Sequence, residues 1–322
     1  MLGILLGCAG AVTTGIFGIF FNYFDFIGLS ESGRTILTPF FVFVCFFSVT
    51  LAKNPKSLIL KNKLLYLTTI CLSGGLLYST YNYTYVKAIE SLPLAITSLF
   101  NFSNAVVLVL LMRLFFKEKI TVKKVICCLI SLVGILFVLE IFSGGDGDIT
   151  TIGIFWGVSV TVSLAFAYTI DYFHIQKEIP FYVVQTYTCL GAIIVYSFNY
   201  SVWDLFKELG SITIQHGAVL WLVLLLYFVN VAISYGATTA SYNFIDASYP
   251  SMTYVLEPTV AATAGFFLYA QRLSAVQIIG MVISVSAIVY MQYIESKGEG
   301  LNRKMMLIKV GEGFAVSMNS KL

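Results

Sequence analysis

The sequence reads Phe115-Phe116-Lys117-Glu118-Lys119-Ile120-Thr121 at one junction between two apolar segments, and Leu268-Tyr269-Ala270-Gln271-Arg272-Leu273-Ser274 at another, 153 positions later. The same shift aligns residues 81–139 with 234–292 without a gap. Similarity at a fixed spacing indicates an internal repeat, and because the identity is low the repeat is a hypothesis about pattern. The two stretches then mark the same place in each copy, between its fourth and fifth helices.

The segments around these junctions are long and apolar. Of the 322 residues, 58% are hydrophobic and 11% charged, with a mean hydropathy of +0.89, whereas a soluble domain carries roughly 25% charged residues. An apolar run of about 20 residues crosses a bilayer as a helix. Ten such runs are predicted, at 2–24, 34–52, 64–87, 93–116, 122–141, 152–174, 180–199, 217–241, 247–270 and 273–294. The sequence therefore predicts an all-α integral membrane protein with ten transmembrane helices.

An odd number of helices in each copy determines how the copies are oriented. After five crossings the chain is on the opposite side of the bilayer, so the second copy must be inverted relative to the first. We expect two inverted five-helix repeats at 1–141 and 152–294, followed by a cytosolic tail at 295–322. The last helix of each repeat keeps a seam of small residues, because the shift places Ser131 and Gly134 on Ser284 and Ala287.

The basic residues predict which side each connection faces. With both termini in the cytoplasm, fifteen of the 19 Lys and Arg residues lie on the inner side, where they are expected to gather. The outer side holds Arg34, Lys87, Lys207 and Arg272. The sequence thus predicts a multi-pass protein of the plasma or inner membrane. Its net charge of +3 reflects this orientation and gives no reason to expect a nucleic-acid partner.

Four short patterns resemble the drug/metabolite transporter superfamily, specifically proteins with two EamA-type domains. They are Gly33-Arg34-Thr35 at the start of helix 2, Lys117-Glu118-Lys119 and Gln271-Arg272 at the two junctions, and Leu256-Glu257-Pro258 in helix 9. The resemblance covers nearly all of residues 1–294. It implies that helices 1–4 and 6–9 surround a central cavity, while helices 5 and 10 lie at the periphery.

Two positions depart from the family pattern. Asn104-Ala105 stands where the first repeat often has a proline, and Gln271 replaces a more common acidic residue. These departures concern the gating of helix 4 more than the fold.

Polar residues are costly in the bilayer core, so those found there are expected to face a cavity or a partner. Glu257 lies about ten residues into its span, near the middle of the bilayer at 1.5 Å per residue. It could bind an amino or cationic group, take up a proton, or only secure helix 9 beside Pro258. Asn104 is its counterpart under the shift, and Asn101 precedes Asn104 by one turn. These amides could contact the substrate or join helices.

A series of tyrosines marks helix 3. Helical spacing places Tyr78, Tyr81, Asn82 and Tyr85 on one face and Tyr83 elsewhere. This face could line an aromatic cavity wall for amphipathic or cationic solutes, or form an aromatic belt at the outer interface. Helix 8 offers a comparable polar face, made of Asn230, Ser234, Tyr235, Thr238 and Tyr242.

Charged residues near the helix ends allow simpler interpretations. Arg34 could attract anions, take part in gating, pair with Glu31, or anchor helix 2 at the interface. Asp171 and His174 end helix 6, where a solvated helix end is a better interpretation than a proton relay. The six cysteines lie in apolar runs, which argues against disulfides and a metal site.

No pattern in the sequence supports catalysis. Nucleotide-binding, HExxH and dinucleotide-binding motifs are missing, and we predict no catalytic residue, no cofactor and no metal. The favoured function is a secondary active transporter that exports small organic metabolites, such as amino acids or related amphipathic or cationic compounds. It would work by alternating access, coupled to a proton or ion gradient or by exchange. The alternatives are a nucleotide-sugar or multidrug transporter, and a membrane scaffold or lipid-handling protein. The expected partners are a small-molecule substrate and the lipid bilayer, and a homodimer is left open.

Overall fold

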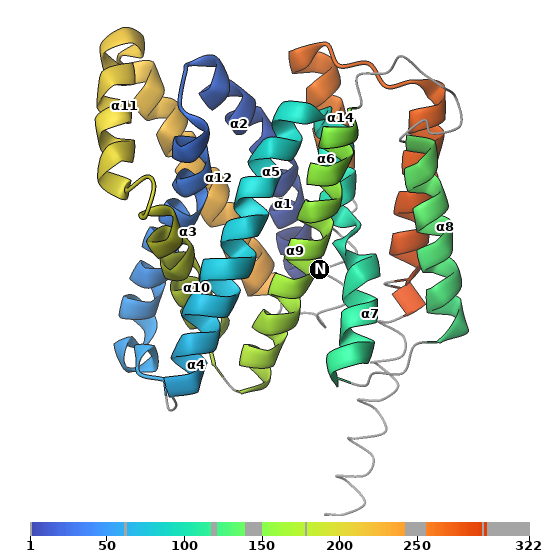
Figure 1. Ribbon diagram of the computed structural model, residues 1–322, viewed down its shortest axis with the longest axis horizontal. Coiled ribbons are helices and arrows are strands. Elements are labelled where there is room, and N and C mark those ends of the chain that lie inside the picture. The colour runs from blue at the N-terminus through green and yellow to red at the C-terminus, as the bar shows by residue number, and fades with distance from the viewer. Residues whose placement is uncertain are drawn as a thin grey trace, which may run out of the picture.

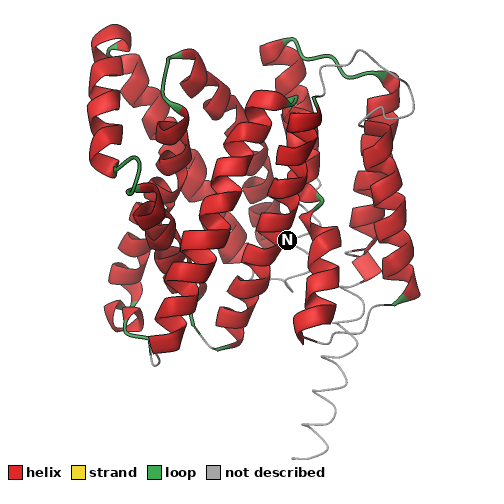
Figure 2. Ribbon diagram, viewed as in Figure 1, coloured by secondary structure: helices red, strands yellow, loops and turns green. Residues whose placement is uncertain are grey.

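We examined a computed structural model of the chain, which describes residues 2–60, 63–116, 121–138, 150–177, 179–241, 256–291 and 293–294. Every regular element within these ranges is a helix (Figure 2). Five helical stretches are long and apolar enough to cross a membrane: Leu5–Phe26, Glu31–Lys53, Leu94–Phe115, Thr151–Asp171 and Ala218–Ala237. The prediction of an all-α fold is therefore confirmed for these residues, whereas the ten transmembrane helices stay a prediction. The proposed tail at 295–322 and Tyr242 lie outside the described residues.

The helices run roughly side by side in one bundle (Figure 1). The first half contains α1 (Leu2–Gly15), α2 (Phe17–Phe26), α3 (Glu31–Lys53), η1 (Pro55–Leu58), α4 (Lys63–Leu67), η2 (Thr68–Tyr78), α5 (Ser79–Ser91), α6 (Leu94–Phe102), α7 (Asn104–Phe116) and α8 (Val122–Val138). The second contains α9 (Thr151–Gln176), α10 (Phe181–Tyr196), α11 (Val202–His216), α12 (Ala218–Ser241), α14 (Leu256–Tyr269) and the helix Ala275–Met291.

Three of the predicted spans are interrupted. The first breaks at Ile16, between α1 and α2, and the fourth breaks at Ser103, between α6 and α7. The third contains η2, a π-helix of 11 residues. Long π-helices are rare and tend to occur at functional sites.

The amphipathic helix α11 lies between two predicted spans, 180–199 and 217–241, where the sequence predicts only a connection. It begins with a capping box, in which the Ser201 hydroxyl and the Asp204 backbone and carboxylate bond each other reciprocally. These bonds from Ser201 hold the pKa of the Asp204 carboxyl below its ordinary value. Leu205, Leu209 and Ile212 form the buried face at helical spacing.

Helices from the two halves pack against each other in defined pairs. They are α1 with α12, α5 with α9, α3 with α10, and α6 with α14. At one edge of the bundle, α8 lies beside the helix Ala275–Met291 (Figure 1). Here the small residues are in contact, since Ser284 Oγ donates to the Ser131 carbonyl at 2.8 Å. A Cβ on Gly280 would lie 2.6 Å from the Gly134 carbonyl oxygen, so the two backbones touch.

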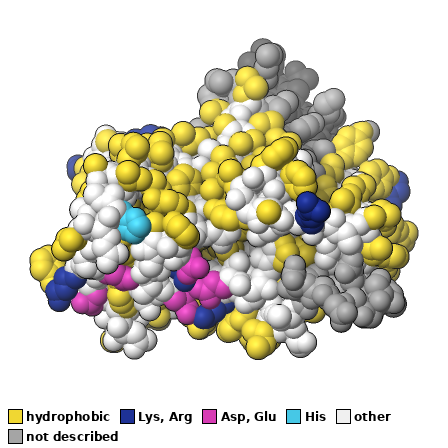
Figure 3. Space-filling model, turned by 90° about the horizontal axis from the view of Figure 1, so that it is seen from above, with side chains coloured by type: hydrophobic (Ala, Val, Ile, Leu, Met, Phe, Trp, Pro, Cys, Tyr) yellow, Lys and Arg dark blue, Asp and Glu magenta, His cyan; other side chains and the backbone are white. Residues whose placement is uncertain are grey.

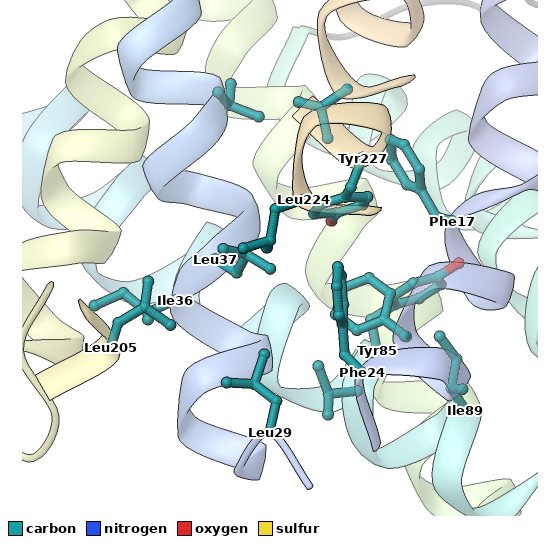
Figure 4. Packing of buried hydrophobic residues seen from close by; sticks show 14 of the residues in the cluster. Phe17, Phe24, Leu29, Ile36, Leu37, Tyr85, Ile89, Leu205, Leu224 and Tyr227 are labelled. Carbon is teal, nitrogen blue, oxygen red and sulfur yellow. The ribbon is translucent and has the colours of Figure 1, made fainter. Parts of the chain in front are cut away.

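An aromatic core joins α1, α2, α3, α5 and α12. Tyr227 of α12 is fully buried and its ring lies 6.0 Å from Phe17 and 5.4 Å from Phe24. Figure 4 shows Tyr227 and Leu224 facing these aromatic residues and Leu37 of α3. The Tyr227 hydroxyl is paired with Thr38 Oγ1 at 2.6 Å, which satisfies its polar end inside the core.

Candidate functional site

The two halves of the chain meet at Asn101 of α6 and Glu257 of α14. Asn101 Nδ2 donates to Glu257 Oε1 at 2.7 Å, and the two residues are 5% and 1% exposed. Glu257 lies in the first turn of α14, directly before Pro258, and α1 approaches so closely that a Cβ on Gly15 would lie 2.8 Å from the Glu257 carbonyl oxygen. Among the described residues, no Lys or Arg forms an ion pair with Glu257. The carboxyl group is thus buried with an amide as its side-chain partner.

Helix α5 extends this polar contact with phenol groups. The Tyr81 hydroxyl donates to Asn101 Oδ1 at 3.2 Å, giving a chain from Tyr81 through Asn101 to Glu257. The Tyr81 ring lies 5.9 Å from that of Tyr78 and 5.8 Å from that of Tyr85. Tyr78 and Tyr85 are buried, so the face lies inside the bundle and not at an outer aromatic belt.

Asn82 and Tyr83 are placed differently from these tyrosines. The Asn82 amide is buried and donates to the Tyr78 carbonyl of its own helix at 2.8 Å. Tyr83 is 40% exposed and packs edge-on against Trp156 of α9, so it points away from the tyrosine face as expected. The Asn82 side chain is therefore bonded within its own helix in this structure.

Two residues of α12 also reach the site. The Tyr235 hydroxyl pairs with that of Tyr78 at 2.8 Å, and Ser234 Oγ pairs with Thr14 Oγ1 of α1 at 2.6 Å. Asn230 is buried, and its Oδ1 has no hydrogen-bond partner among the described residues. The side chain of Thr238, like the whole of Tyr242, lies outside them.

Asn104 does not contact Glu257, although the shift of 153 makes the two positions equivalent. Its Nδ2 donates to the Asn101 carbonyl at 2.6 Å, across the helix break at Ser103. Equivalence in a repeat relates positions by symmetry and does not require them to touch. The neighbour one turn earlier, Asn101, provides the contact.

Arg34 belongs to a network of charges at the upper end of the bundle. Its guanidinium contacts Asp25 at 2.9 Å and Glu90 at 2.6 Å, while Lys87 pairs with Glu31 at 2.5 Å. The prediction that Arg34 pairs with Glu31 is therefore wrong, because Glu31 forms its ion pair with Lys87 of α5. Viewed from above, acidic side chains gather in the lower left part of this end, with basic ones beside them (Figure 3). Arg34 is 4% exposed and joins α2, α3 and α5, so it closes this end rather than presenting a free anion site.

Comparison with known proteins decides the family of the first half. Residues 1–140 match the model described as the EamA-like transporter family. Residues 1–140 are an EamA-like transporter domain. This domain is that of the drug/metabolite transporter superfamily, so the resemblance predicted from the sequence is confirmed for residues 1–140.

A solved structure is similar to the chain over almost its whole length. It is titled only "Crystal structure of protein" and superposes with a TM-score of 0.58 and 15% identity, over 92% of this chain and 97% of its own. At that identity the likeness shows the fold alone. No curated protein matches the sequence.

The match over residues 1–140 and the apolar helices point to a multi-pass membrane protein. The matched family is described as one of transporters, which agrees with the expected function class. The domain contributes Asn101, Tyr78, Tyr81 and Tyr85 to the site, and Glu257, Ser234 and Tyr235 come from the rest of the chain.

A second group of polar residues lies where the EamA-like domain meets α9 and α10. Asp171 and His174 are 7% and 0% exposed, so the expected solvated helix end is wrong. The π-helix η2 and α10 cover them: Ser73 Oγ donates to Asp171 Oδ1 at 3.0 Å, and His174 Nε2 lies 3.1 Å from Thr69 Oγ1. The hydroxyl residues of η2 could have indicated this polar group from the sequence. Thr68, Thr69 and Ser73 lie in an apolar run, and their spacing places them on one side of a helix.

Proposed function

We propose that the chain is a secondary active transporter whose ten transmembrane helices form two inverted five-helix repeats, 1–141 and 152–294. It exports small organic metabolites, such as amino acids or related amphipathic or cationic compounds, across the plasma or inner membrane. Both termini lie in the cytoplasm. Transport follows alternating access, coupled to a proton or ion gradient or by exchange.

The helix pairs support the inverted repeats. In the repeat, helix 1 corresponds to helix 6 and helix 3 to helix 8. If helix 1 contacts helix 8, helix 6 should therefore contact helix 3. Both pairs are in contact, as α1 with α12 and as α5 with α9. Helices 2 and 7 and helices 4 and 9 pack with their own counterparts, as do Ser131 and Ser284, which are 153 positions apart. Such pairs are what a two-fold axis in the membrane plane would produce.

The observation that carries the proposed site is the hydrogen bond between Asn101 and Glu257. It joins helices 4 and 9, one from each repeat, inside the bundle. A carboxyl group with amide and phenol neighbours suits a solute that carries an amino or cationic group and an apolar body. Nucleotide sugars carry several negative charges and would need free basic residues, whereas Arg34 is already paired with Asp25 and Glu90.

Burial of this site supports alternating access. Glu257 is 1% exposed, so a solute cannot reach it unless α6 and α14 separate toward one side of the membrane. The charge network around Arg34 closes the upper end of α2, α3 and α5 in this structure. The site would open to the other side when this network breaks.

Thermal shifts of the purified protein test the site. Ligands that bind the folded state raise its apparent stability, so amino acids, polyamines, nucleosides, sugars and cationic drugs are screened against wild type and Glu257→Gln. This substitution keeps an acceptor for Asn101 and removes the acidic group. We expect one class of compounds to stabilise wild type and the control Asp204→Asn, whose carboxyl lies on α11, but not Glu257→Gln. Equal stabilisation of all three proteins would remove Glu257 from the binding site.

A further inference from the structure

A second buried carboxyl group, Asp171 of α9, lies among polar side chains of η2 and α10. Ser73 Oγ of η2 donates to Oδ1 at 3.0 Å, and Gln185 Nε2 of α10 donates to Oδ2 at 3.2 Å. Thr188 Oγ1 of α10 lies 3.2 Å from Ser73 Oγ. We call Asp171, Ser73, Gln185 and Thr188 the Asp171 cluster. It shares no residue with the Glu257 site.

Among the described residues, no Lys, Arg or His forms an ion pair with Asp171. Two titratable groups lie close by, His174 one turn along α9 and Cys189 on α10, and Tyr78 at the end of η2 contacts Cys189. Neither Cys189 nor Tyr78 carries a positive charge in any protonation state. A buried carboxylate without a counter-charge is costly, so the cluster is suited to a bound cation.

One acceptor in the cluster is unused. Gln185 is 5% exposed, and its Oε1 has no hydrogen-bond partner among the described residues, while its Nε2 serves Asp171. The two ends of an amide have the same shape, so half a turn of the group would bring Oε1 to about the distance that Nε2 now has. Asp171 Oδ1 and Oδ2, Ser73 Oγ, Thr188 Oγ1 and Gln185 Oε1 would then form a set of oxygen ligands.

We propose that the Asp171 cluster binds one monovalent cation of the size of Na⁺. Oxygen ligands suit hard cations, and one carboxylate matches a single positive charge. Without the cation, the Gln185 amide nitrogen and the Ser73 hydroxyl satisfy the carboxylate. With it, the Gln185 amide turns and the hydroxyl oxygens face the ion.

The position of the Asp171 cluster suggests what the cation does. Its ligands come from η2, α9 and α10, and η2 and α10 touch through their backbones at Gly74 and Gly191. A cation held by all three elements favours the conformation in which they are together, because ligands stabilise the state they bind. Its use as the coupling ion rests on the proposed transport function, whereas the binding site itself does not.

Thermal unfolding of the full-length protein in detergent tests the cation site. Sodium chloride is titrated against potassium chloride and choline chloride at constant ionic strength and pH. We expect a saturable, sodium-specific rise in Tm for wild type and for Glu257→Gln, and none for Asp171→Asn. Gln185→Met and Ser73→Ala each remove one ligand and should weaken the apparent sodium affinity about tenfold. Ser163→Ala is the matched control on α9, because its hydroxyl bonds only carbonyls of its own helix.

Several outcomes would overturn the proposal. One is a folded wild type whose Tm shows no sodium-specific rise. Another is a sodium-specific rise in Tm that is equally large in Asp171→Asn. A rise in Tm at lower pH that does not depend on sodium and is lost in Asp171→Asn would indicate that Asp171 binds a proton instead. If Asp171→Asn does not fold, an unchanged sodium affinity in both Gln185→Met and Ser73→Ala would have the same meaning. A sodium response kept in Glu257→Gln, with the solute response lost, separates the two sites.

Discussion

Gly191→Ala should destabilise the protein by several kcal/mol, ~3–5, which is at the upper end for single substitutions. A Cβ on Gly191 would lie 2.0 Å from the Ile70 carbonyl oxygen and 3.0 Å from the backbone nitrogen of Gly75. Since these are backbone atoms of η2, no side chain can move aside, and α10 must separate from η2. We expect a large fall in Tm and in the monodisperse fraction in detergent.

The control for this substitution is Gly210→Ala in α11. A Cβ at Gly210 meets nothing within 4 Å, so the change should be neutral or stabilising by up to ~1 kcal/mol, the usual gain for Ala over Gly in a helix. Opposite signs for two identical substitutions would show that tertiary contact outweighs helix propensity at Gly191. Equal gains in Tm would mean that η2 and α10 are not in backbone contact.

Glu257→Leu should reduce transport by about 100-fold or more, a loss of ~2.7 kcal/mol of stabilisation along the transport cycle. It removes both the carboxyl group and the acceptor for Asn101, which links the two halves. The measurement is counterflow in proteoliposomes, with the solute class that stabilises the wild type. Asn101→Leu should have a comparable effect, because it removes the partner of both Glu257 and Tyr81.

Asn104→Leu provides the comparison for these transport variants. Among the described residues its amide bonds only the Asn101 carbonyl, so we expect transport to change by no more than about threefold, the effect of ~0.6 kcal/mol. A loss in Asn104→Leu as large as that in Glu257→Leu would indicate that the symmetric counterpart, and not Asn101, contacts the solute.

The positions of most helices could be predicted because apolar length is a direct signal of a spanning segment. Residues 34–52 and 152–174 were predicted, and the structure has Glu31–Lys53 and Thr151–Gln176. The interruptions could not be predicted, since Ile16 and Ser103 stand in apolar runs that are compatible with a continuous helix. In contrast, α11 was predictable from Ser201 and Asp204 at capping-box spacing.

The site was predictable only in part, for the same physical reason. Glu257 and Asn101 stand out because polar side chains are costly within apolar spans. Which of them touch depends on how the helices pack, so the alignment related Glu257 to Asn104 while the structure pairs it with Asn101. Asp171 lies near a helix end, where exposure is the usual outcome, and only the packing of η2 and α10 reveals that it is buried.

The central claim is that the two halves are inverted copies, and it is tested most directly at Thr121 and Ser274. These positions are equivalent under the shift of 153, and both are exposed. Thr121 directly precedes α8 and Ser274 directly precedes the helix Ala275–Met291, and these two helices begin at opposite ends of the bundle (Figure 1). Each is changed to cysteine in a chain whose six native cysteines are replaced by alanine, and intact cells are treated with a membrane-impermeant maleimide. Ser274→Cys should react from outside, and Thr121→Cys only after the membrane is permeabilised. Reaction of both from the same side would contradict the inverted repeat.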